Sequence, residues 1–386
     1  MRSGMSFPMP AESRICLVLI FATLEIVNAR HCQTYGNYAG SEDATLWRNG
    51  LVLQSSGLER PPQYPPSNQT GAILGVELGT SSAVPIPRLH RLKIHGIPDD
   101  LDFRPHGLHL DNATQRLYAV CHAAVQREES VVVFDVVPDH EASARAGVQI
   151  PALRFRYALT SPAWTYFNVS FIYFLNDIAA VDGRNELYTT QFGPLRDMTL
   201  HELPADKFLW HCTWNESQTR TNGRLTANCE KVRGAPASRG YNGIAIDPAS
   251  LRLWVNDLWS SRLLVFDRSA ADGSLQYAMD VGVNGSIPLP GVVDNVERDH
   301  DSGDLTMGWF KNAWNVSNGV GGIIEARALG GPGSGRHAKP RQLWQQDTGR
   351  VYQVSTSLSY GRWTILGSCW DTGLIICDND NDSHSK

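Results

Sequence analysis

The stretch Asn242–Asn256, NGIAIDPASLRLWVN, carries the pattern that decides the fold of this 386-residue chain. A polar residue opens a short apolar run, an Asp-containing turn follows, and a Leu eleven residues after the opening residue begins a second apolar run. Short apolar runs separated by turn residues predict paired β-strands. The same pattern recurs at His106–Val120, Asn176–Thr190 and Asp294–Gly308, and shorter versions begin at Glu42 and Thr356.

Six copies of one two-stranded unit indicate a repeat architecture. Their starts are 52 to 70 residues apart, which leaves room for four strands and variable loops in each repeat. We therefore predict an all-β fold, a six-bladed β-propeller over residues 30–386, because a β-sandwich needs no such regular repeat. Two separate domains are the alternative that length alone allows. The segment 195–240 is expected to be a loop between strands.

The N-terminus has the organisation of a secretory signal. Arg2 and Arg14 precede an apolar run at 15–27, and small residues follow before Arg30. As a helix, the 13 residues of this run cover about 20 Å, which is short of the roughly 30 Å hydrocarbon layer. Residues 1–29 are therefore predicted to be a signal peptide of a secreted, extracellular protein. An uncleaved signal that anchors the chain to a membrane or lipid surface is the alternative.

The surface is expected to be mildly acidic and glycosylated. A net charge of -5 is unlike the basic stripe that binds nucleic acid, so no nucleic-acid partner is predicted. Seven Asn-x-Ser/Thr sequons agree with passage through the secretory pathway. The sequons are at Asn68, Asn112, Asn168, Asn215, Asn284, Asn315 and Asn381.

Six cysteines follow the predicted signal and permit up to three disulfide bonds. One favoured pair joins the two ends of the chain and would close a ring-shaped fold, and another is local. These pairs are Cys32 with Cys377 and Cys212 with Cys229. For Cys121 and Cys369, a bond and a buried free thiol are both left open.

The polar residues that open the repeats are candidate metal ligands. In a propeller the first strand of each blade lines the central channel, so these residues converge although they are far apart in sequence. They are Glu42, His106, Asn176, Asn242 and Asp294. Carboxylate and amide oxygens are the ligands that Ca²⁺ prefers, whereas Zn²⁺ favours His and Cys. Adjacent pairs such as Glu42–Asp43 alternate faces on a strand, which favours two ions over one.

Two histidines are candidates for proton transfer. His106 opens the second repeat, and His122 follows the next predicted strand. Imidazole titrates near neutral pH and can take a proton from water. The alternative for His106 and His122 is a purely structural hydrogen-bonding role, and for the Asn and Asp residues a turn-capping role.

Taken together, these stretches resemble the paraoxonase/arylesterase family. The similarity runs in order over nearly the whole mature chain, from about Cys32 to Cys377, and the motifs are specific as a set. They are Ser41–Leu46, Asn49–Leu51, Ser55–Gly57, Arg104–Gly107, Leu175–Val181, Tyr241–Ile244, Val293–Val296 and Ser302–Leu305.

The resemblance implies a six-bladed propeller with two calcium ions in its central tunnel. The implied ligands of the catalytic ion are Glu42, Asn176, Asn242, Asp294 and Asn295. The implied ligands of the structural ion are Asp43, Asp177 and the backbone carbonyl of Leu108. His106 and His122 match the family's proposed histidine dyad, and Cys32 with Cys377 matches its disulfide.

The function expected from this resemblance is calcium-dependent hydrolysis of lactones and aryl esters, with organophosphate hydrolysis as a side activity. Ca²⁺ would polarise the carbonyl of a small-molecule substrate, and the histidine dyad would activate water. The chain departs from the family at Trp309–Phe310, where relatives often carry a Cys-His pair. The alternative is therefore a non-catalytic secreted or membrane-associated calcium-binding propeller that acts as a chaperone or accessory subunit. A sugar-lactonase-like or strictosidine-synthase-like propeller explains the Glu42–Asp43 pair less well.

Overall fold

The structure of the chain is a computed structural model. The described residues are 31–48, 50–57, 71–79, 87–123, 128–164, 167–168, 171–172, 174–192, 208–238, 240–247, 251–282, 291–299, 303–310, 321–326, 340–346 and 354–378. The predicted signal at 1–29 and the sequons at Asn68, Asn284, Asn315 and Asn381 lie outside the described residues. Of the other sequons, Asn112 and Asn215 are exposed.

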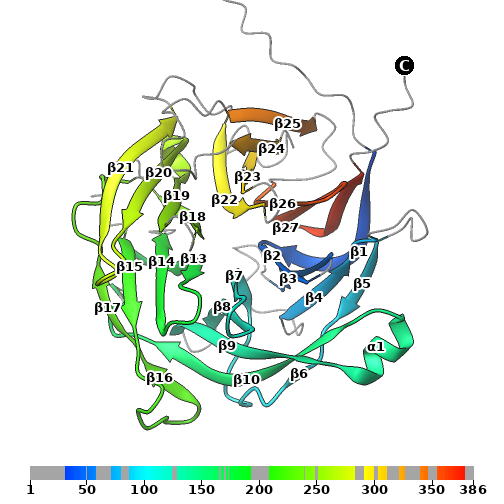
Figure 1. The fold of residues 1–386 in the computed structure, drawn as a ribbon, viewed down its shortest axis with the longest axis horizontal. Helices are drawn as coiled ribbons and strands as arrows, with labels where there is room; N and C mark the ends of the chain where they lie inside the picture. Colours follow the sequence, from blue (N-terminus) through cyan, green and yellow to red (C-terminus); the bar gives the residue numbers. More distant parts are fainter. Residues whose placement is uncertain are drawn as a thin grey trace, which may run out of the picture.

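The strands form sheets arranged in a ring, and the sequence repeats supply the innermost strand of each sheet (Figure 1). These inner strands are β2 (Ala44–Arg48), β7 (Pro105–Asp111), β13 (Phe174–Ala180), β18 (Tyr241–Asp247), β22 (Val292–Arg298) and β26 (Thr356–Tyr360). Each pairs with the strand that follows it, namely β3 (Leu51–Ser56), β8 (Arg116–Ala123), β14 (Glu186–Phe192), β19 (Arg252–Asp257), β23 (Leu305–Phe310) and β27 (Trp363–Asp378). The prediction of an all-β propeller built from these repeats is confirmed.

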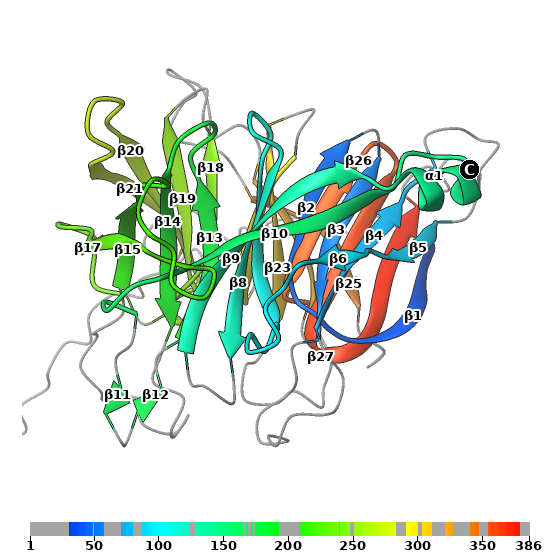
Figure 2. The same cartoon turned by 90° about the horizontal axis from the view of Figure 1, so that it is seen from below.

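The outer strands complete five blades of four or more strands. The additional strands are β4 (Ala72–Glu77), β5 (Arg88–Arg91), β9 (Glu128–Pro138), β10 (Pro151–Thr160), β15 (Phe208–Thr213), β17 (Asn228–Lys231), β20 (Arg262–Arg268), β21 (Leu275–Gly282), β24 (Gly321–Ala326) and β25 (Pro340–Gln346). The short strands β6 (Ile94–His95) and β16 (Arg224–Thr226) both pair with β10, and β11 (Phe167–Asn168) pairs with β12 (Phe171–Ile172) outside the blades. Figure 2 shows most blade strands running roughly along the ring axis.

The remaining sheet closes the ring and has three strands, in the order β1-β27-β26. Because β1 (His31–Ser41) comes from the start of the chain, this sheet is shared between the two ends. The predicted count of six blades therefore differs from what the described residues form, namely five blades of four or more strands and this three-stranded closing sheet.

Both predicted disulfide bonds are present. Cys32 of β1 lies opposite Cys377 of β27 and is bonded to it, which fastens the ring. Cys212 of β15 is bonded to Cys229 of β17. The prediction of a loop at 195–240 is wrong in part, since β15, β16 and β17 lie within it. Cys121 is a buried free thiol, and burial raises its pKa to about 12.

Apolar side chains fill the spaces between neighbouring blades. Leu53 of the first blade packs in one cluster with Leu117 and Phe134 of the second. In the next interface, Val131 of the second blade shares a cluster with Leu187 of the third. Each blade thus buries its apolar surface against its two neighbours, as a repeat architecture requires.

The α-helix α1 (His140–Ala146) lies at the outer rim of the ring, as Figure 2 also shows. The Asp139 side chain caps its N-terminus by accepting a hydrogen bond from the N–H of Ala142, and Gly147 ends it in the left-handed conformation. Within the described ranges, no helix has both the length and the apolar character needed to cross a membrane.

Candidate functional site

Four inner strands share an irregularity at the point where the predicted site residues lie. In β13, Asn176 and Asp177 together oppose the single residue Thr190 of β14, because the pairing register shifts by one between Leu175 and Ile178. The equivalent shift occurs in β7, β18 and β22. Such β-bulges redirect side chains and are frequent beside functional sites. Each of the four bulges contains the polar residue that opens its repeat, and in β13 and β22 a second polar residue follows it.

The first group of residues, which we call the amide set, comprises Glu42, Asn176, Asn242, Asp294 and Asn295. All five are buried. Glu42 accepts a hydrogen bond from Asn295 Nδ2 at 3.1 Å, and the side chain of Asp294 is hydrogen-bonded to that of Asn242. These contacts join residues that are up to 253 positions apart in sequence.

Side-chain oxygens of the amide set lack partners within the protein. The atoms are Asn176 Oδ1, Asn242 Oδ1, Asp294 Oδ1 and Asn295 Oδ1, and none accepts a hydrogen bond. An unsatisfied buried polar group costs about 1–3 kcal/mol. Four such oxygens together with the Glu42 carboxylate fit a hard cation with oxygen ligands. No cluster of three His, Cys, Asp or Glu side chains suited to a metal occurs among the described residues, and three of the five members here are amides.

The second group, the carboxylate set, comprises Asp43, Asp177 and Glu297. Asp43 accepts hydrogen bonds from the N–H groups of Ala44 and Leu108, and its side chain is also hydrogen-bonded to Glu297. Asp177 accepts from the N–H of Ile244 on the neighbouring inner strand. Leu108, predicted as a ligand through its carbonyl, thus contacts Asp43 through its N–H. Glu297 was not predicted, although it lies two residues beyond Asn295.

The histidine pair forms the centre of a chain of four groups. His106 Nε2 lies 3.0 Å from Glu42 Oε2, and His106 Nδ1 lies 2.7 Å from His122 Nε2. His122 Nδ1 lies 2.9 Å from Glu129 Oε2. The two predicted histidines are therefore in contact with each other, and His106 links them to the amide set. Glu129 was also not predicted. It lies directly opposite His122 in the pairing of β8 with β9.

The carboxyl groups at the ring centre have raised pKa values. Burial, reinforced by the charge of Glu42, raises the pKa of Asp43 to about 6. Burial also raises the pKa of Asp177, Asp294 and Glu297 well above the usual range, with nearby carboxylates adding to the effect. Crowded buried carboxylates repel one another, and a divalent cation would relieve this repulsion.

The pKa of His106 responds to the same surroundings. Burial lowers it, but the charges of Glu42, Asp43 and Glu129 outweigh burial, so the net shift is upward. The charge state of the His106 imidazole therefore depends on the neighbouring carboxylates.

Trp309 and Phe310, which stand where the family often has a Cys-His pair, are both buried. Trp309 packs in the core cluster between the fourth and fifth blades, together with Val265 and Met307. Trp309 is therefore part of the core between these two blades.

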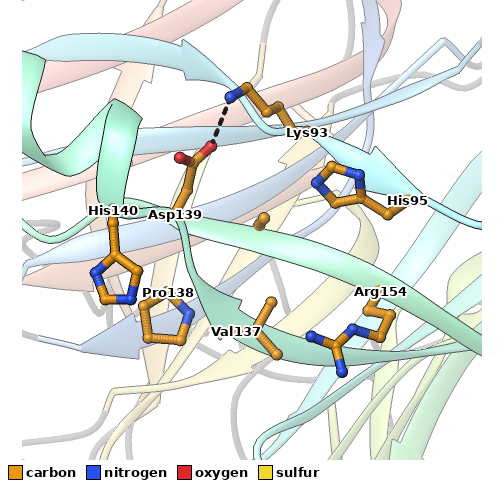
Figure 3. A pocket seen from close by; sticks show the side chains of 8 residues that line it. Lys93, His95, Val137, Pro138, Asp139, His140 and Arg154 are labelled. Carbon is orange, nitrogen blue, oxygen red and sulfur yellow. Dashed lines mark ion pairs between the residues drawn. The ribbon is translucent and has the colours of Figure 1, made fainter.

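A cavity of about 370 Å³ lies elsewhere, on the outer strands of the second blade (Figure 3). Its lining includes His95, His140 and Arg154, and an ion pair of 3.3 Å between Lys93 and Asp139. Because Asp139 is occupied by this ion pair and by capping α1, we take the ring centre, and not this cavity, as the candidate site.

Comparisons with known proteins agree with the fold. No protein-family model matches the sequence, and no curated protein sequence is significantly similar to it. Among solved structures, a luciferin-regenerating enzyme matches with a TM-score of 0.54 and 13% identity over 91% of this chain and 95% of that chain.

Two further solved structures are less similar, with TM-scores below 0.5. A periplasmic gluconolactonase of Pseudomonas aeruginosa is 12% identical over 84% of this chain and 77% of its own, with a TM-score of 0.48. Regucalcin of Agrobacterium tumefaciens, a calcium-binding protein, is 13% identical over 89% and 93%, also with a TM-score of 0.48. The likeness to the luciferin-regenerating enzyme agrees with the observed fold.

Proposed function

We propose that this chain is a calcium-dependent hydrolase of lactones and aryl esters. The observation that carries the proposal is the set of buried, unpartnered oxygens in the amide set, beside a histidine pair in contact with Glu42. Hydrolysis needs a positive centre for the oxyanion and a base for water, and these two groups are adjacent.

In this proposal the amide set holds the catalytic calcium ion. Asp43, Asp177 and the Leu108 carbonyl hold a second, structural ion, and we add Glu297 because its side chain is hydrogen-bonded to Asp43. When bound, the catalytic ion would supply positive charge that polarises the substrate carbonyl.

The protein groups would then handle the water and its proton. His106 is the residue of the pair that contacts Glu42, so it is the proposed base, and His122 behind it accepts the displaced proton. Both imidazoles are largely shielded from bulk water, with side-chain exposures of 5% and 11%, which favours transfer between them over loss to solvent.

The two disulfide bonds fit an oxidising compartment, so we also propose that the protein is secreted. Anchoring by residues 1–29 and glycosylation at the sequons remain predictions.

The test is hydrolysis of a lactone panel and phenyl acetate by the purified protein, in millimolar calcium and after chelation. Asp294→Ala is expected to abolish tight calcium binding in calorimetry and to lower kcat far more than His106→Gln. The reason is that the ion serves every step, whereas the base is replaceable. Asp267→Ala, which removes an exposed carboxylate paired with Arg252, is the matched control and should match the parent.

A folded, calcium-loaded protein that hydrolyses none of these esters would refute the enzymatic proposal. That result would favour the non-catalytic calcium-binding propeller, to which the replacement of the family's Cys-His pair by Trp309–Phe310 also points. Full activity of Asp294→Ala would refute the ligand assignment.

A further inference from the structure

A groove on the outer rim follows the segment 88–95, which reads RLHRLKIH. This segment runs from β5, at the edge of the first blade, to β6, at the edge of the second. Two cavities of about 370 and 380 Å³ lie along it, and both have Lys93 and Asp139 in their linings. The two cavities are therefore parts of one continuous hollow, which we call the rim groove.

Cationic side chains dominate the lining of the rim groove. Five arginine or lysine side chains line it and all five are exposed, whereas Asp139 is the one acidic side chain among the described lining residues. The five are Arg88, Arg91, Lys93, Arg145 and Arg154. The chain as a whole has a net charge of -5, so this positive charge is concentrated locally. A concentration of one sign of charge in a hollow attracts ligands of the opposite sign.

Four polar side chains in this lining have no hydrogen bond or ion pair to another described residue. They are Arg88, His95, His140 and Arg154. His95 of β6 lies directly opposite Arg154 of β10 in the parallel pairing of these strands, and both line the first cavity (Figure 3). Guanidinium and imidazole N–H groups are hydrogen-bond donors, so the groove offers unused donors to an external acceptor.

We propose that the rim groove binds an extended sulfated polysaccharide. The segment 88–95 spans roughly 23 Å when extended, so its cations are spread along a line. A single small anion would reach only some of them, whereas a chain with repeated sulfate groups reaches all of them. Apolar side chains, including Val137, Pro138 and Ile150, line the groove beside the cations and suit the C–H faces of sugar rings.

The shape of the groove favours a narrow polymer over a membrane surface. The cations line a hollow, whereas an anionic bilayer presents a broad surface that a hollow cannot follow. The proposed secretion would bring the groove into the compartment that contains sulfated polysaccharides, and away from the nucleic acids of the cell interior. This inference does not depend on the proposed ester hydrolysis.

The test is binding of the purified full chain to a heparin decasaccharide, measured by calorimetry at about 0.15 M NaCl. The variant with both Arg88→Gln and Arg154→Gln is expected to bind about tenfold more weakly, since each exposed ion contact contributes about threefold. The slope of log Kd against log salt concentration should also fall by about 1.5, because two fewer counterions are displaced. Both side chains are exposed and without a partner among the described residues, so the melting temperature should not change.

The variant with both Lys231→Gln and Arg233→Gln is the matched control. It removes the same charge from exposed positions in the third blade, at the end of β17 and just beyond it. We expect its affinity for the decasaccharide to stay within about twofold of the parent, because charges beyond the Debye length of about 8 Å are screened.

Glu141→Gln tests the groove by a gain of affinity. The exposed Glu141 carboxylate pairs with Lys93 at 3.2 Å and with Arg145 at 3.1 Å. Its neutralisation frees both cations for the ligand and is expected to tighten binding by about threefold. Asp267→Asn, which neutralises an exposed carboxylate of the fourth blade, should leave the affinity within about 1.5-fold of the parent.

Several outcomes would overturn the inference. One is the absence of heparin binding at physiological salt, and another is a double arginine variant that binds as tightly as the parent. Equal affinity for a hyaluronan decasaccharide, which lacks sulfate, would show that sulfate is not recognised. Binding to phosphatidylserine vesicles without binding to heparin would assign the groove to a membrane surface instead. Failure of ester hydrolysis leaves each of these measurements unaffected, so the two proposals are judged separately.

Discussion

Gly107→Ala is expected to destabilise the protein by pushing two inner strands apart. Gly107 lies in the bulge of β7, directly against β13. A Cβ atom at this position would be 2.5 Å from Asp177 Oδ1, 2.6 Å from Asp177 Cα and 2.7 Å from the carbonyl oxygen of Asn176. Ordinary contacts begin near 3.4 Å, so the strands would have to separate by nearly 1 Å. Two of the three obstructing atoms belong to the backbone, so a rotamer change cannot relieve the overlap.

The size of the effect follows from the cost of overpacking. Insertion of a methyl group into a closely packed region costs about 1–3 kcal/mol, and rigid backbone on the opposing side favours the upper end. In a chain of this length, about 3 kcal/mol corresponds to a fall in Tm of about 4 °C. Separation of β7 from β13 should also weaken calcium binding, because His106 and Asn176 lie on these two strands.

Thermal unfolding followed by circular dichroism, with calcium titration by calorimetry, measures both effects. Gly75→Ala in β4 is the control, since its Cβ would meet only side-chain carbons, the nearest being Leu92 Cδ2 at 3.1 Å. We expect the control to cost less than about 1 kcal/mol. Equal melting temperatures for Gly107→Ala and the parent would refute the close approach of the inner strands.

Three further predictions concern stability. The pKa of Asp43 is raised to about 6, against 3.8 in the unfolded chain. The calcium-free folded protein therefore binds a proton at Asp43 more tightly than the unfolded chain does. The contribution of Asp43 to stability is present below pH 3.8 and is lost as the pH rises through about 6, so urea unfolding should show a loss of at least about 2 kcal/mol between pH 4 and 7. The raised pKa values of Asp177, Asp294 and Glu297 add to this loss, and saturating calcium should reduce it. Cys377→Ser opens a bond with a sequence separation of 345 and should cost about 6 kcal/mol, against about 3 kcal/mol for Cys229→Ser with a separation of 17; equal losses would contradict the loop-entropy reasoning. Arg268→Met removes the nearer cation of the buried Glu186 carboxylate, leaves only Arg184 at 3.8 Å, and should cost about 3 kcal/mol in the same assay, whereas a loss below 1 kcal/mol would show that this ion pair is dispensable.

The sequence predicted the repeat unit well because the strand periodicity is local. All six opening positions lie at or just before an inner strand, and the two disulfide pairs are formed as predicted. The segment 195–240 was harder to interpret, because β16 and β17 are only three and four residues long. Strands this short carry too few residues for an alternating pattern, and their pairing is fixed by partners such as Cys212.

The candidate site was predicted in part. The residues of the amide set were named from their place in the repeat, but Glu129 and Glu297 were not. Glu129 owes its position to the register of the β8–β9 hairpin and to the approach of β13 from another blade. Such contacts join residues that have no fixed spacing in the sequence, so a local sequence pattern does not predict them.

By itself, the sequence determined the all-β repeat, the polar residues at the repeat openings and the cysteines that close the ring, since each depends on residue type and spacing along the chain. Only the tertiary structure decided that consecutive residues such as Asn176 and Asp177 lie together in a bulge opposite one residue. A regular strand would turn neighbouring side chains to opposite faces. Glycines in two of the other bulges, Gly107 and Gly243, let neighbouring inner strands approach within backbone contact. That approach is a property of the closed ring, which no single repeat encodes.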